Sequence, residues 1–274
     1  MTTARPTITG TTRVVPIIGQ PIRQVRSPDL FNALAARRGA DAVLVPIEVA
    51  PADVPGFVAF HRTWRNSPGF IVTVPHKRAV AGLADALSPR AARLGAVNLV
   101  VRDAEGRLAG DHLDGMGFLA AMRAHGVVPW GRSALVVGVG GAGSAIANAL
   151  CEAGVARLAL RDLDVTRLDA VRAMLRREFP GVEVAEDAPG LGLGAYDLVV
   201  NATPVGMGGT GGLPMAAAEI ATLRPGAHVA DVVTDPRVTP FLAAARARGC
   251  SVQAGEEMVA AQMEAFARGL GLLE

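Results

Sequence analysis

The stretch Val137-Gly138-Val139-Gly140-Gly141-Ala142-Gly143 decides the fold of the second half of the chain. Its glycines have the G-x-G-x-x-G spacing, after an apolar run over 134–139 that predicts a strand and before a helical pattern over 142–153. Glycine permits the tight turn and lets the backbone approach a pyrophosphate, while the helix amino terminus presents amides to negative charge. We therefore expect this loop, including Gly141 and Ala142, to bind a dinucleotide cofactor.

An acidic residue follows the glycines at a suitable distance. Asp162 ends the next predicted strand, nineteen residues after Gly143, where a carboxylate would accept hydrogen bonds from ribose hydroxyls. Asp162 and Asp164 would repel a 2′-phosphate, which favours NAD over NADP. Arg161 and Arg167 are cations close to them, so NADP stays open, and we include Arg167 among the cofactor-binding residues. An ordinary βα turn is the competing interpretation of the glycines.

Outward from this loop, short apolar runs alternate with helical patterns along the whole chain, which predicts an α/β fold. Strands are expected over 14–18, 42–49, 69–74 and 96–102. From Arg132 onward strands and helices alternate more closely, with strands expected over 134–139, 157–161, 197–201 and 228–233. Helices are expected over 142–153, 165–177 and 256–269 and between the early strands. The first helix has Ser27 as its expected N-cap, Pro28 at its first position and Gly39 as its stop.

These patterns predict two domains. An N-terminal α/β substrate domain comprises residues 1–113 and is completed by the C-terminal helix within 251–274. A Rossmann-type, doubly wound dinucleotide-binding domain comprises residues 114–250. The 274 residues suit this division, because a domain commonly has roughly 150 residues.

Composition excludes several classes of protein. Half of the residues are hydrophobic and the mean hydropathy is +0.33, yet no apolar run approaches the roughly 18 residues of a membrane helix. No secretory signal is recognisable, and Cys151 and Cys250 form neither a disulfide framework nor a metal cluster, so we expect no metal and a reducing cytoplasm. The net charge of +2 is spread along the chain, so nucleic acid is not an expected partner. We expect a monomer or a homodimer that binds a small molecule.

Lysine usage singles out one residue for chemistry. Of the 27 basic residues, 26 are arginine and only Lys77 is lysine. A dehydrogenase needs a group that exchanges the hydroxyl proton, and a lysine amine can be tuned to do so whereas arginine cannot. The Tyr-x-x-x-Lys pair is absent, because the only tyrosine, Tyr196, has Val200 four residues on. Zinc-dependent alcohol oxidation lacks its cysteine ligands. A surface lysine retained by chance is the competing interpretation of Lys77.

Several motifs occur in a fixed order along nearly the whole chain. They are Gly19-Gln20-Pro21-Ile22, Arg26-Ser27-Pro28, Val72-Thr73-Val74-Pro75-His76-Lys77, Gly95-Ala96-Val97-Asn98, Gly110-Asp111-His112-Leu113-Asp114-Gly115, the glycine loop, Asn201-Ala202-Thr203-Pro204, Thr239-Pro240-Phe241-Leu242, and Gln262. Because these motifs occur in this order, the chain resembles the shikimate/quinate dehydrogenase family. The resemblance implies reversible hydride transfer between a secondary hydroxyl of a cyclic polyhydroxy acid and a nicotinamide cofactor.

The resemblance also implies roles for individual residues. Lys77 and Asp114 match the family's catalytic dyad, with Lys77 exchanging the hydroxyl proton and Asp114 as its hydrogen-bonding partner. Positions that hold the substrate are matched by Ser27, Thr73, Asn98 and Gln262, and the cofactor-binding set gains Asn201 and Thr203. Structural alternatives stay open: Ser27 could serve only as a helix cap, Asp114 as a turn residue, and Asn98 and Gln262 as polar residues that satisfy the backbone or a helix edge.

Three departures from the family pattern bear on the substrate. Val25 and Ile71 stand where the family usually has serine and asparagine, and Thr234 stands where many members have tyrosine. Each lost hydrogen bond to a polyhydroxy acid is worth about 1 kcal/mol. A dehydrogenase acting on a different cyclic alcohol is therefore one rival interpretation, and a catalytically idle protein that binds NAD or a metabolite is another. These residues do not choose between aromatic biosynthesis, quinate breakdown and the synthesis of another precursor.

Overall fold

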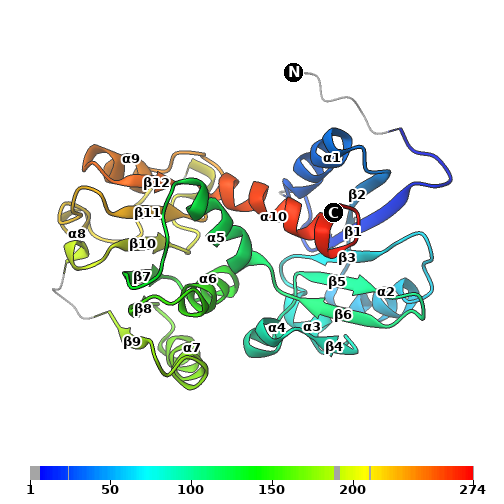
Figure 1. The fold of residues 1–274 in the computed structure, drawn as a ribbon, viewed down its shortest axis with the longest axis horizontal. Coiled ribbons are helices and arrows are strands. Elements are labelled where there is room, and N and C mark those ends of the chain that lie inside the picture. Colours follow the sequence, from blue (N-terminus) through cyan, green and yellow to red (C-terminus); the bar gives the residue numbers. More distant parts are fainter. Residues whose placement is uncertain (1–6, 24, 188–191, 210, 274) are drawn as a thin grey trace. The chain divides into compact units, whose positions relative to one another are not determined.

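The computed structural model describes residues 7–23, 25–187, 192–209 and 211–273. They form two compact units (Figure 1). The first unit takes the chain up to Leu113 and again from Gln262, and the second runs from Asp114 to Ala261. Each unit has its own six-stranded sheet, so the expected α/β class with two domains is confirmed.

The sheet of the first unit is mixed. Its strands are β1 (Arg13–Gly19), β2 (Ala42–Glu48), β3 (Gly69–Val72), β4 (Ala86–Leu87), β5 (Leu99–Arg102) and β6 (Leu108–Asp111). They are arranged in the order β2-β1-β3-β5-β6-β4. The first three run parallel, whereas β5 is antiparallel to both β3 and β6. The carboxyl ends of β1, β2 and β3 therefore share one edge, where ligands bind in open α/β sheets.

Short helices connect these strands. They are α1 (Ser27–Arg38), the 3-10 turn η1 (Pro51–Asp53), α2 (Val54–His61), α3 (Lys77–Ala81) and α4 (Pro89–Leu94). A core of Ile18, Val54, Phe70, Val80 and other apolar side chains joins the sheet to α2 and α3. β3 is shorter than expected, because the His76 amide bonds to the Thr73 carbonyl and turns the chain away from the sheet.

The start of α1 differs from the expected one. The N-cap residue is Arg26, whose side chain makes no capping hydrogen bond, and Ser27 is already helical, so the interpretation of Ser27 as the helix cap is wrong. A cap needs an extended backbone before the first turn, but Arg26 has the helical angles φ −93° and ψ −11°. The expected stop is confirmed, because Gly39 ends α1 with a left-handed backbone at φ 68°.

The sheet of the second unit is entirely parallel within the described residues. Its strands are β7 (Ser133–Val137), β8 (Arg157–Arg161), β9 (Glu183–Glu186), β10 (Leu198–Asn201), β11 (His228–Asp231) and β12 (Ser251–Gln253), arranged as β9-β8-β7-β10-β11-β12. Counted from β7, this is the order 3-2-1-4-5-6 of a Rossmann fold. The strand order reverses between β7 and β10, and the crevice beyond their carboxyl ends is the expected ligand site.

Helices cover both faces of this sheet. They are α5 (Asp114–Ala124), α6 (Gly141–Glu152), α7 (Val165–Glu178), α8 (Ala217–Ile220) and α9 (Pro240–Ala247), with 3-10 turns η2 (Leu193–Ala195) and η3 (Met207–Gly209). Alternate residues of β7 point to opposite cores: Ala134 and Val136 pack in one, Leu135 and Val137 in the other. Burial on both faces explains why these strands are apolar without a polar alternation.

The last helix, α10 (Gly255–Gly269), belongs to both units. We expected the second unit to end at residue 250, but β12 pairs with β11 and extends the second sheet by Ser251–Gln253. The chain returns to the first unit at Gln262, in the middle of α10. There the helix packs on the first sheet, since a side chain at Gly269 would meet Leu99 at 2.7 Å.

Candidate active site

The glycine loop closes β7 and opens α6. Gly138 has φ +88°, and a β-carbon there would meet the Thr203 side chain at 2.7 Å. A β-carbon on Gly143 would overlap the Gly138 carbonyl, so Gly143 allows the first turn of α6 to pack on the loop. Gly140 and Gly141 have no atom within 4 Å of such a position. Two of the glycines thus shape the turn, and two leave open space beside the helix amino terminus.

Asp162 is bonded to the loop that it follows in the fold. One carboxylate oxygen accepts from the Val139 amide at 2.7 Å, and the other accepts from the Asp164 amide and from Arg167 Nη2, both at 2.9 Å. Burial alone would raise the pKa of Asp162, but hydrogen bonds from Arg167 and the two amides lower it below its usual value. Asp162 is therefore an anion that fixes the loop and pairs with Arg167.

The end of β10 is held by a buried polar network. Asn201 Oδ1 accepts from the amide and the hydroxyl of Thr203, at 3.0 and 2.7 Å, and its Nδ2 donates to Asp231 at 3.0 Å. Asp231 also accepts from the Thr239 hydroxyl at 2.7 Å and from the Val233 amide at 3.0 Å. Burial raises the pKa of Asp231 although these hydrogen bonds oppose it. Asn201 is fully buried, so it positions Thr203.

A pocket of about 470 Å³ opens between the glycine loop and Thr203. It is lined by Val137, Gly138, Gly140, Arg161, Asp162, Leu163, Arg167, Ala202, Thr203, Pro204, Val205 and Pro214. Five of these residues are expected cofactor-binding residues, whereas the expected Gly141, Ala142, Gly143 and Asn201 are not among the lining residues. The size, the open helix terminus and the carboxylate at Asp162 fit a dinucleotide.

In the first unit, backbone hydrogen bonds gather three of the expected site residues at the carboxyl end of β3. The Val72 amide bonds to the Asn98 carbonyl, and the Val97 amide bonds to the Lys77 carbonyl. The chain turns between Thr73 and Lys77, and these two hydrogen bonds place both ends of the turn beside the segment that contains Asn98. Thr73 and Lys77 are half-buried, and Asn98 is buried with its Oδ1 accepting from the Leu113 amide at 2.7 Å. A polar corner with a lysine in it forms at the edge where ligands collect.

The other expected residues lie on three helices. Ser27 is half-buried at the first position of α1, and Gln262 is buried in α10. Asp114 is buried as the first residue of α5, which belongs to the second unit. Of the departures, Ile71 is buried in β3 opposite Ile17, while Val25 and Thr234 are half-buried.

Three polar residues outside the expected site set have roles in the structure, although the sequence motifs already include Thr239, and Arg161 is one of the cations close to Asp162 in the sequence. Asp231 and Thr239 hold the pocket wall, and Arg161, which lines the pocket, is bonded to Asp187 and Glu219. Asp231 could have been identified from its position, because it lies at the end of an apolar run, as Asn201 does. His76 is structural, since its ring bonds to the Val49 carbonyl at 2.7 Å. Within the described ranges there is no cluster of three potential metal ligands, and none of the helices described could span a membrane.

A parallel sheet in this order with a glycine-rich turn at its switch point defines a dinucleotide-binding α/β protein of the Rossmann class. The family model described as the shikimate dehydrogenase substrate binding domain matches residues 17–100. A shikimate dehydrogenase (NADP⁺) of Citrifermentans bemidjiense is 42% identical over 272 residues, covering 96% of this chain and 91% of the relative. The chain belongs to the shikimate dehydrogenase family, whose members are oxidoreductases.

Solved structures agree with this assignment. A quinate dehydrogenase of Corynebacterium glutamicum in complex with NAD is 33% identical, with a TM-score of 0.85 over 95% of this chain and 94% of that one. A ligand-free 5-ketofructose reductase of a Gluconobacter species is 28% identical, with a TM-score of 0.88 over 94% and 92% of the two chains. The same fold therefore serves relatives that are named for different substrates.

Proposed function

We propose that this protein catalyses the reversible oxidation of a ring secondary hydroxyl on a shikimate- or quinate-like cyclic acid, with NAD as the preferred cofactor. The observation that carries the proposal is the 470 Å³ pocket at the switch point of the second sheet, with Asp162 in its wall. The nicotinamide, when bound, supplies the hydride chemistry. The residues of the chain bind the two reactants and handle the proton.

The preference for NAD rests on the charges around the pocket. Arg161 and Arg167 are the cations in its wall, and each is engaged by carboxylates. Arg161 bonds to Asp187 and Glu219, and Arg167 bonds to Asp162 with Asp164 at 3.6 Å. Four carboxylates surround two guanidinium groups, so a 2′-phosphate would meet a surplus of negative charge, whereas ribose hydroxyls can donate to Asp162. The relative solved with NAD agrees with this preference, and the relatives named for NADP⁺ make it worth testing.

Lys77 is the proposed proton acceptor, with Asp114 as its partner. An amine at the first turn of α3 can lose its proton, which the guanidinium groups elsewhere in the chain cannot do near neutral pH. Both residues match the family's dyad motifs in this sequence.

The proposed substrate contacts are Ser27, Thr73, Asn98 and Gln262. Ser27 gains support from its place in α1, because Arg26 occupies the N-cap position and Ser27 is therefore not the helix cap. Thr73 and Asn98 gain support from their place beside Lys77 at the carboxyl edge of the sheet. Each offers a hydroxyl or amide that suits a polyhydroxy acid.

A second candidate is a dehydrogenase for a different cyclic alcohol. Ile71 carries this alternative, because it is buried in β3 and offers no hydrogen bond where the family usually has asparagine. The similarity to a 5-ketofructose reductase also favours it. Shikimate, quinate and other hydroxylated cyclic compounds, each assayed with NAD and NADP, separate the two candidates. Dinucleotide binding by calorimetry without turnover of any alcohol would establish the idle binding protein instead.

The test of the proton role is a pair of substitutions. Lys77→Ala and Lys77→Arg should each lower turnover by a factor on the order of 10² to 10⁴, because neither side chain can exchange the proton. Calorimetry should find NAD affinity little changed in both variants. Arg78→Ala, at the exposed neighbouring position of α3, is the matched control and should keep full turnover. Full turnover in Lys77→Arg would rule out the proton role.

A further inference from the structure

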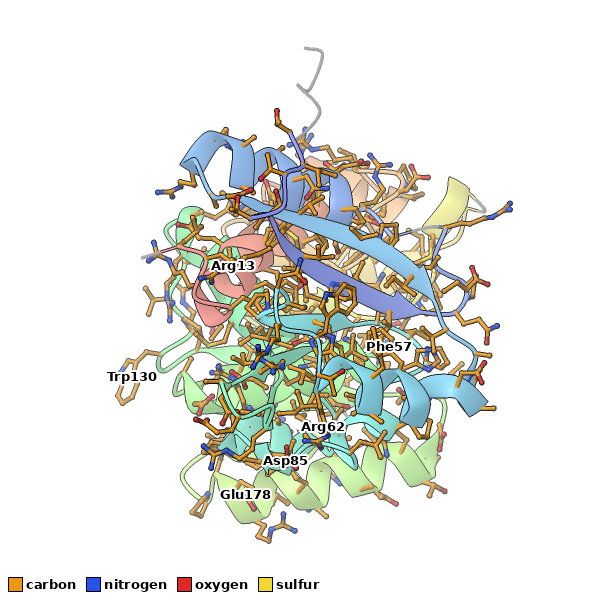
Figure 2. The ribbon with its side chains drawn as sticks, turned by 90° about the vertical axis from the view of Figure 1, so that its right-hand side faces the viewer. Arg13, Phe57, Arg62, Asp85, Trp130 and Glu178 are labelled. Atoms are coloured by element: carbon orange, nitrogen blue, oxygen red, sulfur yellow. The ribbon has the colours of Figure 1, made fainter. Side chains whose placement is uncertain are left out.

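A second pocket lies at the amino end of the first sheet. Its volume is about 240 Å³, and it is lined by Arg13, Arg65, Asn66, Ser67, Pro68, Arg102, Asp103 and Ala104. Arg13 begins β1 (labelled in Figure 2), residues 66–68 lead into β3, and Arg102 ends the antiparallel strand β5. The pocket is thus at the edge of the sheet opposite to Thr73 and Lys77, and the reaction proposed above does not use it.

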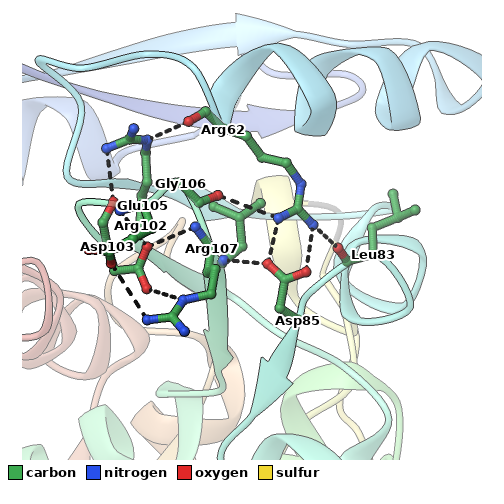
Figure 3. A network of polar contacts seen from close by, with 9 residues as sticks. Arg62, Leu83, Asp85, Arg102, Asp103, Glu105, Gly106 and Arg107 are labelled. Carbon is green, nitrogen blue, oxygen red and sulfur yellow. Dashed lines mark hydrogen bonds and ion pairs between the residues drawn. The ribbon is translucent and has the colours of Figure 1, made fainter.

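Arg102 presents a fixed positive charge there. Its Nε donates to the Arg62 carbonyl at 2.8 Å and its Nη1 to the Asp103 carbonyl at 3.0 Å (Figure 3). Both partners are neutral backbone groups, so they hold the guanidinium in place without compensating its charge. A preorganised guanidinium loses little conformational entropy when it binds a ligand.

The carboxylate in the pocket wall is already committed elsewhere. Asp103 accepts from Arg107 Nε at 2.7 Å and from the amides of Glu105 and Arg107 at 3.1 and 2.8 Å (Figure 3). The hydrogen bond from Arg107 is the main cause of its lowered pKa. Asp103 therefore stays ionised, and its negative charge is paired with the Arg107 guanidinium through the hydrogen bond from Nε.

The other two cations are exposed. Arg13 and Arg65 have no carboxylate partner among the residues that the structure describes. Three guanidinium groups thus line one small pocket. The one carboxylate among its lining residues, Asp103, is paired with Arg107, which is not a lining residue. Like charges this close repel one another, and an anion between them would relieve that repulsion. Guanidinium forks match the planar and tetrahedral oxyanions, phosphate above all, in bidentate geometry.

We propose that this pocket binds a small phosphate-bearing anion, either inorganic phosphate or a phosphate monoester. The pocket wall has only Pro68 and Ala104 as apolar members, so it offers no platform for a large apolar group. The described lining residues of this pocket belong to the first unit, and those of the cofactor pocket belong to the second. The proposal is independent of which alcohol the enzyme oxidises.

The test is calorimetric titration of the full chain with inorganic phosphate and with glycerol phosphate, at constant ionic strength and with NAD saturating. Saturating NAD prevents phosphate from binding at the glycine loop. Arg13→Gln and Arg65→Gln should each raise the Kd about tenfold, because each removes a charge-assisted hydrogen bond. Arg37→Gln, which removes an exposed charge of α1 in the same unit, is the matched control and should leave the Kd unchanged.

Tighter binding of glycerol phosphate would identify a phosphate ester as the ligand, and tighter binding of inorganic phosphate would identify the free anion. The proposal is overturned if neither anion binds, or if Arg37→Gln weakens binding as much as Arg65→Gln does. Turnover should be unchanged in all three variants, so failure of this proposal would not be confused with failure of the proposed reaction.

Discussion

Asp162 combines two tasks in one side chain. One of its oxygens accepts from the Val139 amide and so holds the glycine loop, and the other accepts from Arg167. The charge on Asp162 therefore controls whether Arg167 is available to a cofactor phosphate. Selectivity between NAD and NADP should depend on this pair more than on the shape of the pocket.

Asp162→Asn should shift selectivity toward NADP. The amide removes the negative charge that repels a 2′-phosphate and weakens the bond to Arg167, while it keeps an oxygen for the Val139 amide. We expect the ratio of kcat/KM for NAD to that for NADP to fall by about tenfold or more. Steady-state kinetics with both cofactors measures it. Asp169→Asn, which breaks an exposed pair with Arg172 in the same helix, is the control, and an unchanged ratio in Asp162→Asn would contradict the assignment.

His61 is a titratable residue in an apolar environment. Its ring lies among those of Phe57, Trp64 and Phe70. Its Nε2 is 3.5 Å from the Ser67 hydroxyl, and its Nδ1 has no hydrogen-bond partner among the described residues. Burial, with repulsion from Arg102, lowers the pKa of His61 from 6.5 to about 4. Between these two values the unfolded chain binds a proton that the folded chain does not, so the stability of the first unit falls as the pH falls.

His61→Phe should remove this pH dependence. From pH 7 to pH 5 the wild type should lose about 2 kcal/mol of unfolding free energy through His61, and the variant should not. Urea unfolding followed by Trp64 fluorescence, with Trp130→Phe in both proteins, measures the first unit. The phenyl ring replaces the imidazole with little loss at pH 7, because Nδ1 has no hydrogen bond to lose and the contact of Nε2 with the Ser67 hydroxyl is long, at 3.5 Å. Equal pH dependence in the two proteins would contradict the lowered pKa.

At the scale of elements, α6 depends on one close contact. The helix starts directly on the glycine loop, and Gly143 faces the Gly138 carbonyl with no room for a β-carbon. Gly141 lies in the same first turn and faces open space. Only Gly143 is therefore required to be glycine by a close contact, although both residues belong to the same glycine-rich loop.

Gly143→Ala should separate α6 from the loop. We expect a loss of stability of about 1 to 3 kcal/mol from the forced shift, together with weaker NAD binding, because the amides at the helix terminus move. Gly141→Ala should be nearly neutral for stability, since alanine suits a helix and meets no neighbour. Thermal unfolding and NAD calorimetry on both variants measure this. Similar effects of the two substitutions would show that the overlap is not the cause.

Two Ser-Pro pairs explain why helix starts were only partly predictable. Ser88-Pro89 begins α4 as the motif suggests, because Ser88 has an extended backbone and accepts from the Ala91 amide. Ser27-Pro28 has the same letters, but Arg26 is already helical. Tertiary contacts set the backbone angles at the start of each helix, and the local sequence does not specify those contacts. For the same reason, β4 has two exposed residues and no pattern, and it exists only because β6 pairs with it.

The candidate site was predictable where a motif fixes local geometry. The loop around Gly138, the acid at 162 and Thr203 meet in one pocket because β7, β8 and β10 end at the same edge. Asn201, one of the expected cofactor-binding residues, accepts hydrogen bonds from Thr203 and positions that residue. Whether a polar residue lines a pocket or holds the residue that does so depends on side-chain direction, which spacing alone does not give.

At the scale of the molecule, the two units have separate sheets and separate cores, and α10 contributes to both. The pocket beside Asp162 is formed by second-unit residues, and the arginine pocket by first-unit residues. A ligand that binds the folded form of one unit stabilises that unit by mass action. Each ligand should therefore leave a distinct pattern of protection in the two units.

Hydrogen exchange should resolve these patterns. At about 100 times its Kd, NAD should slow exchange in the core strands β7 and β10 by about 100-fold, where amides exchange through unfolding of the second unit. The strands β1 and β3 should change much less. Phosphate added to the NAD-saturated protein should slow exchange in β1 and β3 instead, and Arg65→Gln should abolish that second effect. Equal protection of both sheets by NAD alone would mean that the units unfold as one cooperative structure, contrary to the separate cores.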